Sequence, residues 1–416
     1  MKLKDLSINI FSGGTPSTTN EEFWNGEFYW LSSGETKNTY IRKTEKTITK
    51  LGVEKSSTRL AKTGDVVIAS AGQGKTRGQV AYCLTDTYIN QSIIAIRPIE
   101  ELLNSKYLFY NLTSRYNELR LLSDSSSSRG SLTVKIFEEL DINLPKIDNQ
   151  NKIAKILSNY DDLIENNNKR IKILEEIVQK IYKEWFVDFK FPGHEFVKFK
   201  ETELGKVPSN WEIKKVREIS SLSKGKSYKS SEIVGKEKGL PFLNLKCIER
   251  DGGFRRDGLK WLDGKYNDTQ IVLPEDIIMA VTDMTQERRL VARPARIPHN
   301  WYNKYVMSMD LVKLIANNDI NKSYFYSLLK YSNFSNEVKN HANGANVLHL
   351  NPQNIEQFEL VVADKNTRDV FGEIVNQFYN EIDILYLKNE ILKQTRDILL
   401  PRLISGEIDV EKMDIA

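Results

Sequence analysis

The sequence predicts an α+β protein built from two mixed α/β domains that are separated and followed by long helices pairing as an antiparallel coiled coil. Three observations predict this fold class. Short motifs recur at a nearly constant offset along the chain. Runs of β-branched residues alternate with amphipathic segments, and two stretches repeat apolar residues in alternating steps of four and three.

Length and composition agree with a globular protein of two or three cores. The chain has 416 residues, of which 40% are hydrophobic and 28% are charged. No window approaches the roughly 18 to 20 apolar residues of a membrane span, and the first residues, Met1–Leu6, lack the apolar core of a signal peptide. We therefore expect a cytoplasmic protein with no membrane partner.

Cysteine and histidine usage argues against a metal site. Cys83 and Cys247 stand alone in different halves without CxxC spacing, so we expect buried apolar fillers rather than a disulfide or a zinc site. The four histidines form no ligand spacing such as HxxxH. No metal is expected on this chain.

Charge is uneven along the chain. The net charge is only +4, but residues 31–80 contain ten Lys and Arg against four acids. A basic excess in a loop-rich region suits contacts to phosphate groups, and a solvated basic face is the alternative interpretation.

The internal repeat sets the order of the parts. Gly64–Ala69 is echoed by Glu275–Ala280, and Ser131–Pro145 by the segment that starts at Leu348. The repeat predicts a first domain at residues 1–147, a helical spacer at 148–190, a second domain at 191–365 with a linker at 191–207, a second spacer at 366–405 and a tail at 406–416.

Inside each domain, β-branched runs predict strands and amphipathic runs predict helices. The expected strands are Asp65–Ala69, Ser92–Ile96, Asp276–Val281 and Met309–Ile315, and the expected helices are Tyr107–Leu121 and Ser323–Val338. Ser123–Gly130 and His341–Asn346 occupy corresponding places as loops of small residues between a helix and the last strand.

The two spacers carry the seam of a coiled coil. Its positions are 153, 157, 160, 164, 167, 171, 174, 178, 181 and 185 in the first spacer, and 371, 375, 378, 382, 385, 389, 392, 396, 399 and 403 in the second. They are apolar except for Asn167, Asn389 and Arg396. Two matched seams in one chain favour pairing within the molecule.

An antiparallel register that places Asn167 opposite Asn389 gives almost every seam residue an apolar partner. Trp185 then faces Phe371, and only the pairing of Tyr160 with Arg396 is mixed. A buried Asn pair lowers stability but disfavours slipped registers, so we expect Asn167 and Asn389 to fix the register of the helices. A seam of about 35 residues would span about 50 Å, more than one turn of DNA.

One segment resembles a phosphate-binding loop but lies in the wrong context. Ala69–Thr76 ends in Gly-Lys-Thr after an expected strand. A true loop of this kind opens a helix, whereas Arg77–Cys83 reads as another strand. A glycine-rich turn that carries Lys75 and Arg77 suits contact with a DNA backbone or a base edge better.

Motifs of DNA-modifying enzymes are missing from the sequence. Asn351–Asn354 lacks the second proline and the aromatic residue with which an adenine methyltransferase grips its base, and no PD-(D/E)xK nuclease arrangement occurs. We therefore expect no catalytic residue and no bound cofactor on this chain, which would make it a non-enzymatic subunit.

With the repeat and the helices in view, nearly the whole chain resembles the specificity subunit of a type I restriction-modification system. The most specific segments are Ile181–Phe189 and Leu399–Glu407, which resemble the ends of that family's two conserved helical regions. Val281–Gln286 resembles a recurrent loop of one class of recognition domain, and Leu3–Leu6 and Trp211–Val216 resemble domain openings.

The resemblance implies a division of labour among subunits. Two target recognition domains would each read one half of a split double-stranded DNA target, with helix length setting the gap. Two modification (methyltransferase) subunits holding S-adenosylmethionine would grip the helices, and restriction subunits that use ATP and magnesium would join for cleavage.

Candidate DNA contacts are basic and polar residues on the expected loops, because phosphates are met by Lys and Arg and base edges by forked or hydroxyl donors. They are Arg42, Lys43, Lys75, Arg77 and Arg129 in the first domain, and Tyr228, Lys229, Arg255, Arg256, Thr282, Arg288 and Arg289 in the second. For each of them, a structural or solvent-facing role is the alternative. Replacing Arg77 or Arg288 by Ala is expected to weaken target binding without changing the melting temperature.

Two other functions remain open at this point. The chain could be a self-sufficient nuclease or methyltransferase fused to recognition domains, although the missing motifs argue against it. It could also be a coiled-coil scaffold or regulator unrelated to restriction, which would not bind a methyltransferase.

Overall fold

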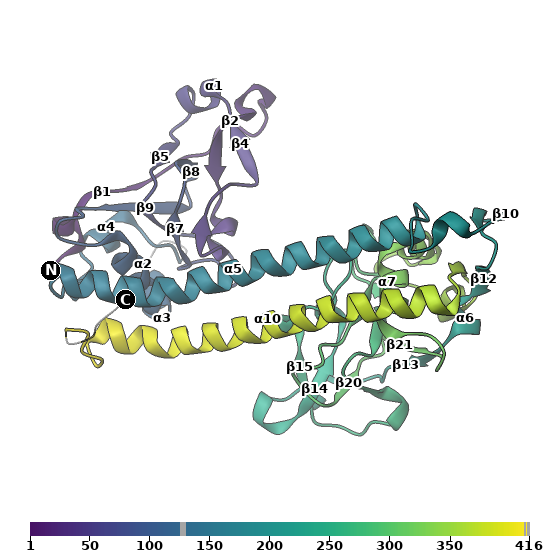
Figure 1. The fold of residues 1–416 in the computed structure, drawn as a ribbon. Helices are drawn as coiled ribbons and strands as arrows, with labels where there is room; N and C mark the ends of the chain where they lie inside the picture. Colours follow the sequence, from purple (N-terminus) through teal and green to yellow (C-terminus); the bar gives the residue numbers. More distant parts are fainter. Residues whose placement is uncertain (125–129, 412, 414–416) are drawn as a thin grey trace. The chain divides into compact units, whose positions relative to one another are not determined.

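A computed structural model describes residues 1–124, 130–411 and 413 of the chain. These residues form two units, here called unit 1 (residues 1–165 and 391–416) and unit 2 (residues 166–390). Each unit combines one globular domain with half of each of the two long helices, α5 and α10 (Figure 1). The units therefore differ from the linear domains expected from the sequence, because each unit also includes part of both helical spacers.

Unit 1 contains a five-stranded and a four-stranded sheet. The first has the strand order β1-β9-β6-β7-β3 and the second β4-β2-β8-β5. The strands are β1 (Ser7–Ser12), β2 (Trp24–Leu31), β3 (Tyr40–Ile41), β4 (Lys46–Ile48), β5 (Arg59–Ala61), β6 (Val66–Ala69), β7 (Val80–Cys83), β8 (Thr87–Ile89) and β9 (Ile93–Pro98). Pairing is antiparallel except for β3 with β7 and β2 with β8. The strands expected at 65–69 and 92–96 are confirmed as β6 and β9.

Unit 2 repeats this topology. Its larger sheets have the orders β13-β21-β17-β19 and β15-β14-β20-β16, and β14 pairs with β20 in parallel as β2 does with β8. The strands of the two sheets are β13 (Ser220–Lys224), β14 (Leu240–Leu243), β15 (Lys260–Leu262), β16 (Ile271–Val272), β17 (Ile277–Ala280), β19 (Pro294–Arg296), β20 (Tyr305–Met307) and β21 (Leu311–Ala316). The shared strand order confirms the internal repeat and the strands expected at 276–281 and 309–315.

Three two-stranded ladders complete unit 2. They pair β10 (Phe199–Thr202) with β11 (Gly205–Pro208), β12 (Glu212–Lys215) with β23 (Glu359–Val362), and β18 (Thr282–Asp283) with β22 (Leu348–His349). The last ladder brings the loop after β17 next to the small-residue loop that precedes β22.

The helix expected in each domain is broken at one point. In unit 1, α2 (Ser105–Ser114) ends before Arg115, whose guanidinium donates to Glu118 and to the carbonyl of Asp141, and α3 (Tyr116–Asp124) follows. In unit 2, α7 (Lys322–Tyr331) ends at extended Ser332, whose hydroxyl accepts from the N–H of Phe334 at the start of α8 (Phe334–Val338). The remaining short helices are α1 (Lys50–Glu54), α4 (Val134–Glu138), α6 (Val216–Ile219) and α9 (Pro352–Glu356).

The long helices are α5 (Ile147–Phe186) and α10 (Lys365–Ser405), and they run antiparallel as expected (Figure 1). In unit 2, Trp185 lies against Phe371 with ring centroids 5.7 Å apart, and the amide of Asn167 donates to Asn389 at 2.9 Å. Both contacts follow the register derived from the sequence. In unit 1, Arg396 pairs with Asp161 rather than with Tyr160, because the carboxylate can neutralise the guanidinium.

Each unit has its own core, and both long helices contribute to it. In unit 1, Leu157 of α5 and Leu403 of α10 pack with Tyr107 of α2, and in unit 2, Val178 and Phe371 pack with Tyr324 of α7. Both cysteines are buried as expected, and burial raises the pKa of the Cys247 thiol to about 12. In the described part of the chain, no helix has the length and hydropathy needed to cross a membrane.

Candidate nucleic-acid interface

The loop between β6 and β7 is the glycine-rich turn of unit 1 that carries Lys75 and Arg77. Gly72, Gly74 and Gly78 have φ values of +146°, +61° and +85°, which side-chain-bearing residues rarely adopt. From α3, the hydroxyl of Tyr116 donates to the carbonyl of Lys75 at 2.9 Å, and Arg120 donates to the carbonyl of Gly74 at 2.7 Å. These bonds fix the backbone of the loop from behind and leave the Lys75 side chain exposed.

Arg77 points back into unit 1 instead of outward. Its side chain is 13% exposed, forms an ion pair with Asp124 at the end of α3, and donates to the carbonyl of Gly130. The residue therefore joins the hairpin loop to the loop of small residues, and it is not a freely exposed cation. The expectation that its removal would leave the melting temperature unchanged has to be revised.

The other candidates of unit 1 lie on the surface or outside the described residues. Lys43 is exposed, and Arg42 is half exposed and pairs with Glu165 of α5 at 2.6 Å. Arg129 lies outside the described residues. Within unit 1, Lys43 and Lys75 are thus the candidates whose charge faces solvent with no ion pair recorded among the described residues.

In unit 2, the loop that follows β17 is organised by a carboxylate that sequence reasoning missed. Asp283 is fully buried and accepts hydrogen bonds from the backbone N–H groups of Thr285, Leu290 and Val291 at 2.9, 2.7 and 3.2 Å. Burial by itself would raise the pKa of Asp283, but these bonds outweigh it and the pKa is lowered. An Asp directly after a buried strand and before a polar loop is the signal that could have identified this role.

The same loop is tied to the small-residue loop of unit 2. Arg288 donates to the carbonyl of Ala342 at 3.4 Å, and Gln286 donates to the carbonyl of Ala345 at 3.0 Å. Arg288 itself sits at φ +53°, a left-handed conformation held by these contacts. Units 1 and 2 therefore share one contact, in which an arginine of the hairpin loop donates a hydrogen bond to a backbone carbonyl of the small-residue loop.

Two candidates of unit 2 are buried instead of surface residues. Thr282 lies in β18 and is 5% exposed, and its hydroxyl donates to Asp310, just before β21, at 3.2 Å. Arg256 has a side chain only 8% exposed and lies between the rings of Trp301 and Tyr386. Sequence reasoning placed both on recognition loops, because an isolated polar or basic residue gives no sign of what folds over it.

The remaining candidates of unit 2 lie at its surface with local partners. Arg289 pairs with Asp251 at 2.7 Å, and Arg255 forms a forked pair with Asp257 at 2.6 and 2.8 Å. Lys229 is exposed, and Tyr228 is half buried with its ring edge-on to Phe242. Exposed ion pairs of this kind are weak, so Arg255 and Arg289 can exchange their carboxylates for phosphates at small cost.

Two further features bear on the chemistry of the described residues. They contain no group of three or more His, Cys, Asp or Glu side chains that could hold a metal ion. The helix pair buries the amides of Asn167 and Asn389 at 8% and 2% exposure, and Asn389 also donates to Asn168 at 2.9 Å.

Comparisons with known proteins point to one family. The family model described as "Type I restriction modification DNA specificity domain" matches residues 1–176 and 208–394. A type I restriction enzyme specificity subunit (MjaIX) of Methanocaldococcus jannaschii is 28% identical over 99% of this chain and 94% of its own length. The EcoR124I/EcoR124II specificity subunit of Escherichia coli is 32% identical over 45% of this chain and 47% of its own length.

A solved structure supports the fold. The S subunit of a type I restriction-modification system from M. genitalium matches with a TM-score of 0.58 at 18% identity, and the match covers 97% of this chain and 95% of that one.

Proposed function

This chain belongs to the type I restriction modification DNA specificity family and is a DNA-recognition subunit, and from that premise we propose that each of its two domains reads one half of a split double-stranded target. The observation that carries the proposal is the duplicated pair of loops. In each unit, an arginine of a hairpin loop donates to a backbone carbonyl of a second loop. Arg77 donates to the carbonyl of Gly130 in unit 1, and Arg288 donates to that of Ala342 in unit 2. Fixed loops hold base-reading and phosphate-contacting side chains in place without an ordering cost on binding.

Phosphate contacts are proposed for the exposed or weakly paired cations. In unit 1 these are Arg42, Lys43 and Lys75, and in unit 2 they are Lys229, Arg255 and Arg289. Met284 is 64% exposed on the loop that Asp283 organises, and an exposed thioether there can contact a thymine methyl group. We assign Arg77, Thr282 and Arg288 to positioning of the loops.

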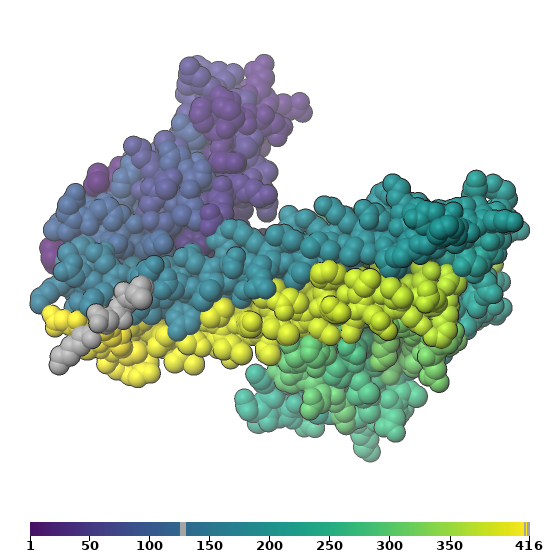
Figure 2. Space-filling view, in the orientation of Figure 1, coloured from purple at the N-terminus to yellow at the C-terminus, as the bar shows by residue number. Residues whose placement is uncertain are grey.

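Methylation and cleavage are proposed to belong to partner subunits. Two modification subunits would hold S-adenosylmethionine, and restriction subunits would use ATP and magnesium. A surface for such partners is offered by α10, where Ile391 and Ile398, seven residues apart, are 55% and 61% exposed in unit 1. In unit 2, Ile384 continues the same heptad position at 37% exposure. Figure 2 shows atoms of α10, in yellow-green and yellow, at the surface in this view.

The helices are proposed to set the number of unspecified bases between the half-targets. Each of them is a single element of 40 or 41 residues that continues from one unit into the other. At 1.5 Å per residue, a helix of this length extends for about 60 Å.

Methylome sequencing of the host with and without this gene tests the proposal. We expect the loss of one methylated motif that consists of two short specified halves and a gap. The purified chain, incubated alone with DNA and S-adenosylmethionine and then with magnesium and ATP, should neither methylate nor cleave. Activity of the chain alone, or an unchanged methylome, would refute a pure recognition role.

A further inference from the structure

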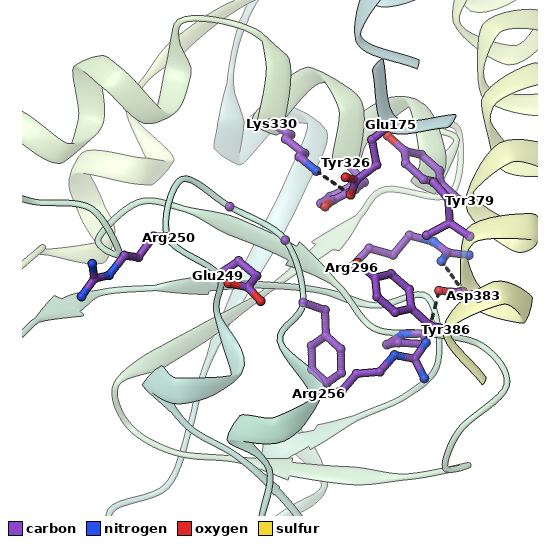
Figure 3. Close-up of a pocket in the computed structure, with 15 residues that line it drawn as sticks. Glu175, Glu249, Arg250, Arg256, Arg296, Tyr326, Lys330, Tyr379, Asp383 and Tyr386 are labelled. Atoms are coloured by element: carbon purple, nitrogen blue, oxygen red, sulfur yellow. Dashed lines mark hydrogen bonds and ion pairs between the residues drawn. The ribbon is translucent and has the colours of Figure 1, made fainter. Parts of the chain in front are cut away.

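Unit 2 contains a cavity of about 330 Å³ (Figure 3). Its walls come from α10 (Tyr379, Asp383 and Tyr386), from α7 (Tyr326 and Lys330) and from the segment around Arg256. A cavity of this size is at the lower end of the range of small-molecule sites.

Arg256 is a buried cation in this wall with unused donors. Its side chain is 8% exposed, and its guanidinium carbon lies 5.0 Å from the ring centres of both Trp301 and Tyr386. The Nη1 and Nη2 atoms are buried and have no hydrogen-bond partner. The oxygen of Asp383 that comes nearest is 3.8 Å away, beyond hydrogen-bond distance.

The acidic groups around the cavity have other partners or lie in solvent. Asp383 accepts from Arg296 at 2.7 Å and from the backbone N–H of His299 at 3.1 Å. Glu175 faces Lys330 at 3.8 Å, and Glu249 is exposed. Burial lowers the pKa of Arg256, but arginine keeps its proton in proteins. The side chain is therefore a charged guanidinium whose terminal nitrogens have no hydrogen-bond acceptor.

The missing acceptor has a definite chemistry. A planar guanidinium with two free terminal nitrogens matches two oxygens of a phosphate or carboxylate group. Aromatic side chains form part of the remaining wall: the ring centres of Tyr326 and Tyr379 are 5.3 Å apart, and Tyr386 lies beside Arg256. The cations Arg250, Arg296 and Lys330 also line the cavity and suit an anionic group. Aromatic walls suit a planar ring.

We propose that this cavity binds a phosphate ester of mononucleotide size, with the phosphate on Arg256 and the planar ring against the tyrosines. The site belongs to unit 2 alone and does not depend on the reading of DNA by the loops. The same phosphate chemistry could reach Arg256 from the backbone of DNA, and the experiment below separates the two sources.

The test is the thermal melting of the full chain at constant ionic strength, with chloride replaced in turn by AMP, inorganic phosphate or adenosine. We expect AMP at about twenty times its Kd to raise the melting temperature by roughly 3 to 6 °C, with a smaller rise for phosphate and none for adenosine. The variant Arg256→Gln should lose the response. Lys246→Gln, which removes an exposed cation of unit 2 that neither lines the cavity nor is a candidate DNA contact, is the matched control and should keep it.

Several outcomes would overturn the assignment. If replacing chloride by AMP does not raise the melting temperature of the wild-type chain, the cavity is not such a site. This result holds even if Arg256→Gln does not fold. An equal response in Arg256→Gln would place binding elsewhere. If AMP gives no response while Arg256→Gln lowers the salt slope of duplex binding by about 0.9, the phosphate comes from DNA and the mononucleotide is ruled out.

Discussion

Lys75 and Arg77 lie two positions apart on one loop and have opposite surroundings. Lys75 is exposed, whereas Arg77 is 13% exposed and is bound to Asp124 and Gly130. A sequence reader gives both the same role, because both are cations in a glycine-rich turn. The structure separates a side chain that can meet a phosphate from one that holds the loop in shape.

Replacing these residues should therefore give two different phenotypes. Lys75→Ala should reduce duplex affinity and lower the salt slope of binding by about 0.9 with an unchanged melting temperature. Arg77→Ala removes an ion pair with exposed Asp124 and a part-buried hydrogen bond to the Gly130 carbonyl, so it should cost about 1 kcal/mol of stability, with a lower melting temperature and weaker binding. Salt-dependent binding titrations and thermal melts measure both effects.

Lys75→Arg is the control, since it keeps the charge and should keep the salt slope. Stable Arg77→Ala protein with a lower salt slope would instead show that Arg77 itself touches a phosphate.

At the scale of the element, the helix pair contains one polar layer in an apolar seam. The amides of Asn167 and Asn389 are bonded to each other and almost fully buried. A buried polar pair is less stabilising than two leucines, but it is satisfied only when the two residues face each other. Its value lies in excluding other registers.

Single and double replacements should act in opposite directions. Asn389→Leu alone leaves Asn167 without its partner and should lower the melting temperature, whereas Asn167→Leu with Asn389→Leu should raise it. The double variant should also loosen the register. Cysteines at Leu174 and Ile382, which share the seam register of Asn167 and Asn389, report the correct pairing, and cysteines at Leu174 and Val375 report a slip of one heptad.

In the wild-type background, only the first cysteine pair should form a disulfide. Absence of the slipped disulfide in the double leucine variant would mean that packing of the apolar seam, rather than the Asn pair, fixes the register.

For the whole molecule, the proposed link between helix length and DNA spacing is testable at the boundary of the units. One heptad inserted after Glu165 of α5 and another after Glu390 of α10 leave the contacts within each unit intact. Seven residues lengthen each helix by about 10 Å, or about three base pairs of DNA. The methylated motif should keep both specified halves and gain a gap longer by that amount.

Insertion of the heptad into α5 alone is the matched control. It shifts the seam residues of α5 by seven positions relative to their partners on α10. That variant should lose methylation. A paired insertion that leaves the gap unchanged would show that helix length does not set the spacing.

The long helices, their pairing and several strands were predictable from the sequence, because they depend on the local periodicity of apolar residues. Steps of four and three define a seam, so the sequence alone placed Trp185 opposite Phe371 and Asn167 opposite Asn389, and β-branched runs marked β6, β9, β17 and β21. The breaks at Arg115 and Ser332 were missed, because neither residue is a glycine or proline that would mark the end of a helix in the sequence.

Candidate site residues were predictable only as a class. The sequence by itself determined that this protein has two repeated domains, a paired helical spacer and basic loops, since periodicity and composition are properties of the chain. Only the tertiary structure decided which cations face solvent, because burial is set by distant segments. Asp124 and Gly130 cover Arg77, Trp301 and Tyr386 enclose Arg256, and the backbone of a whole loop converges on Asp283.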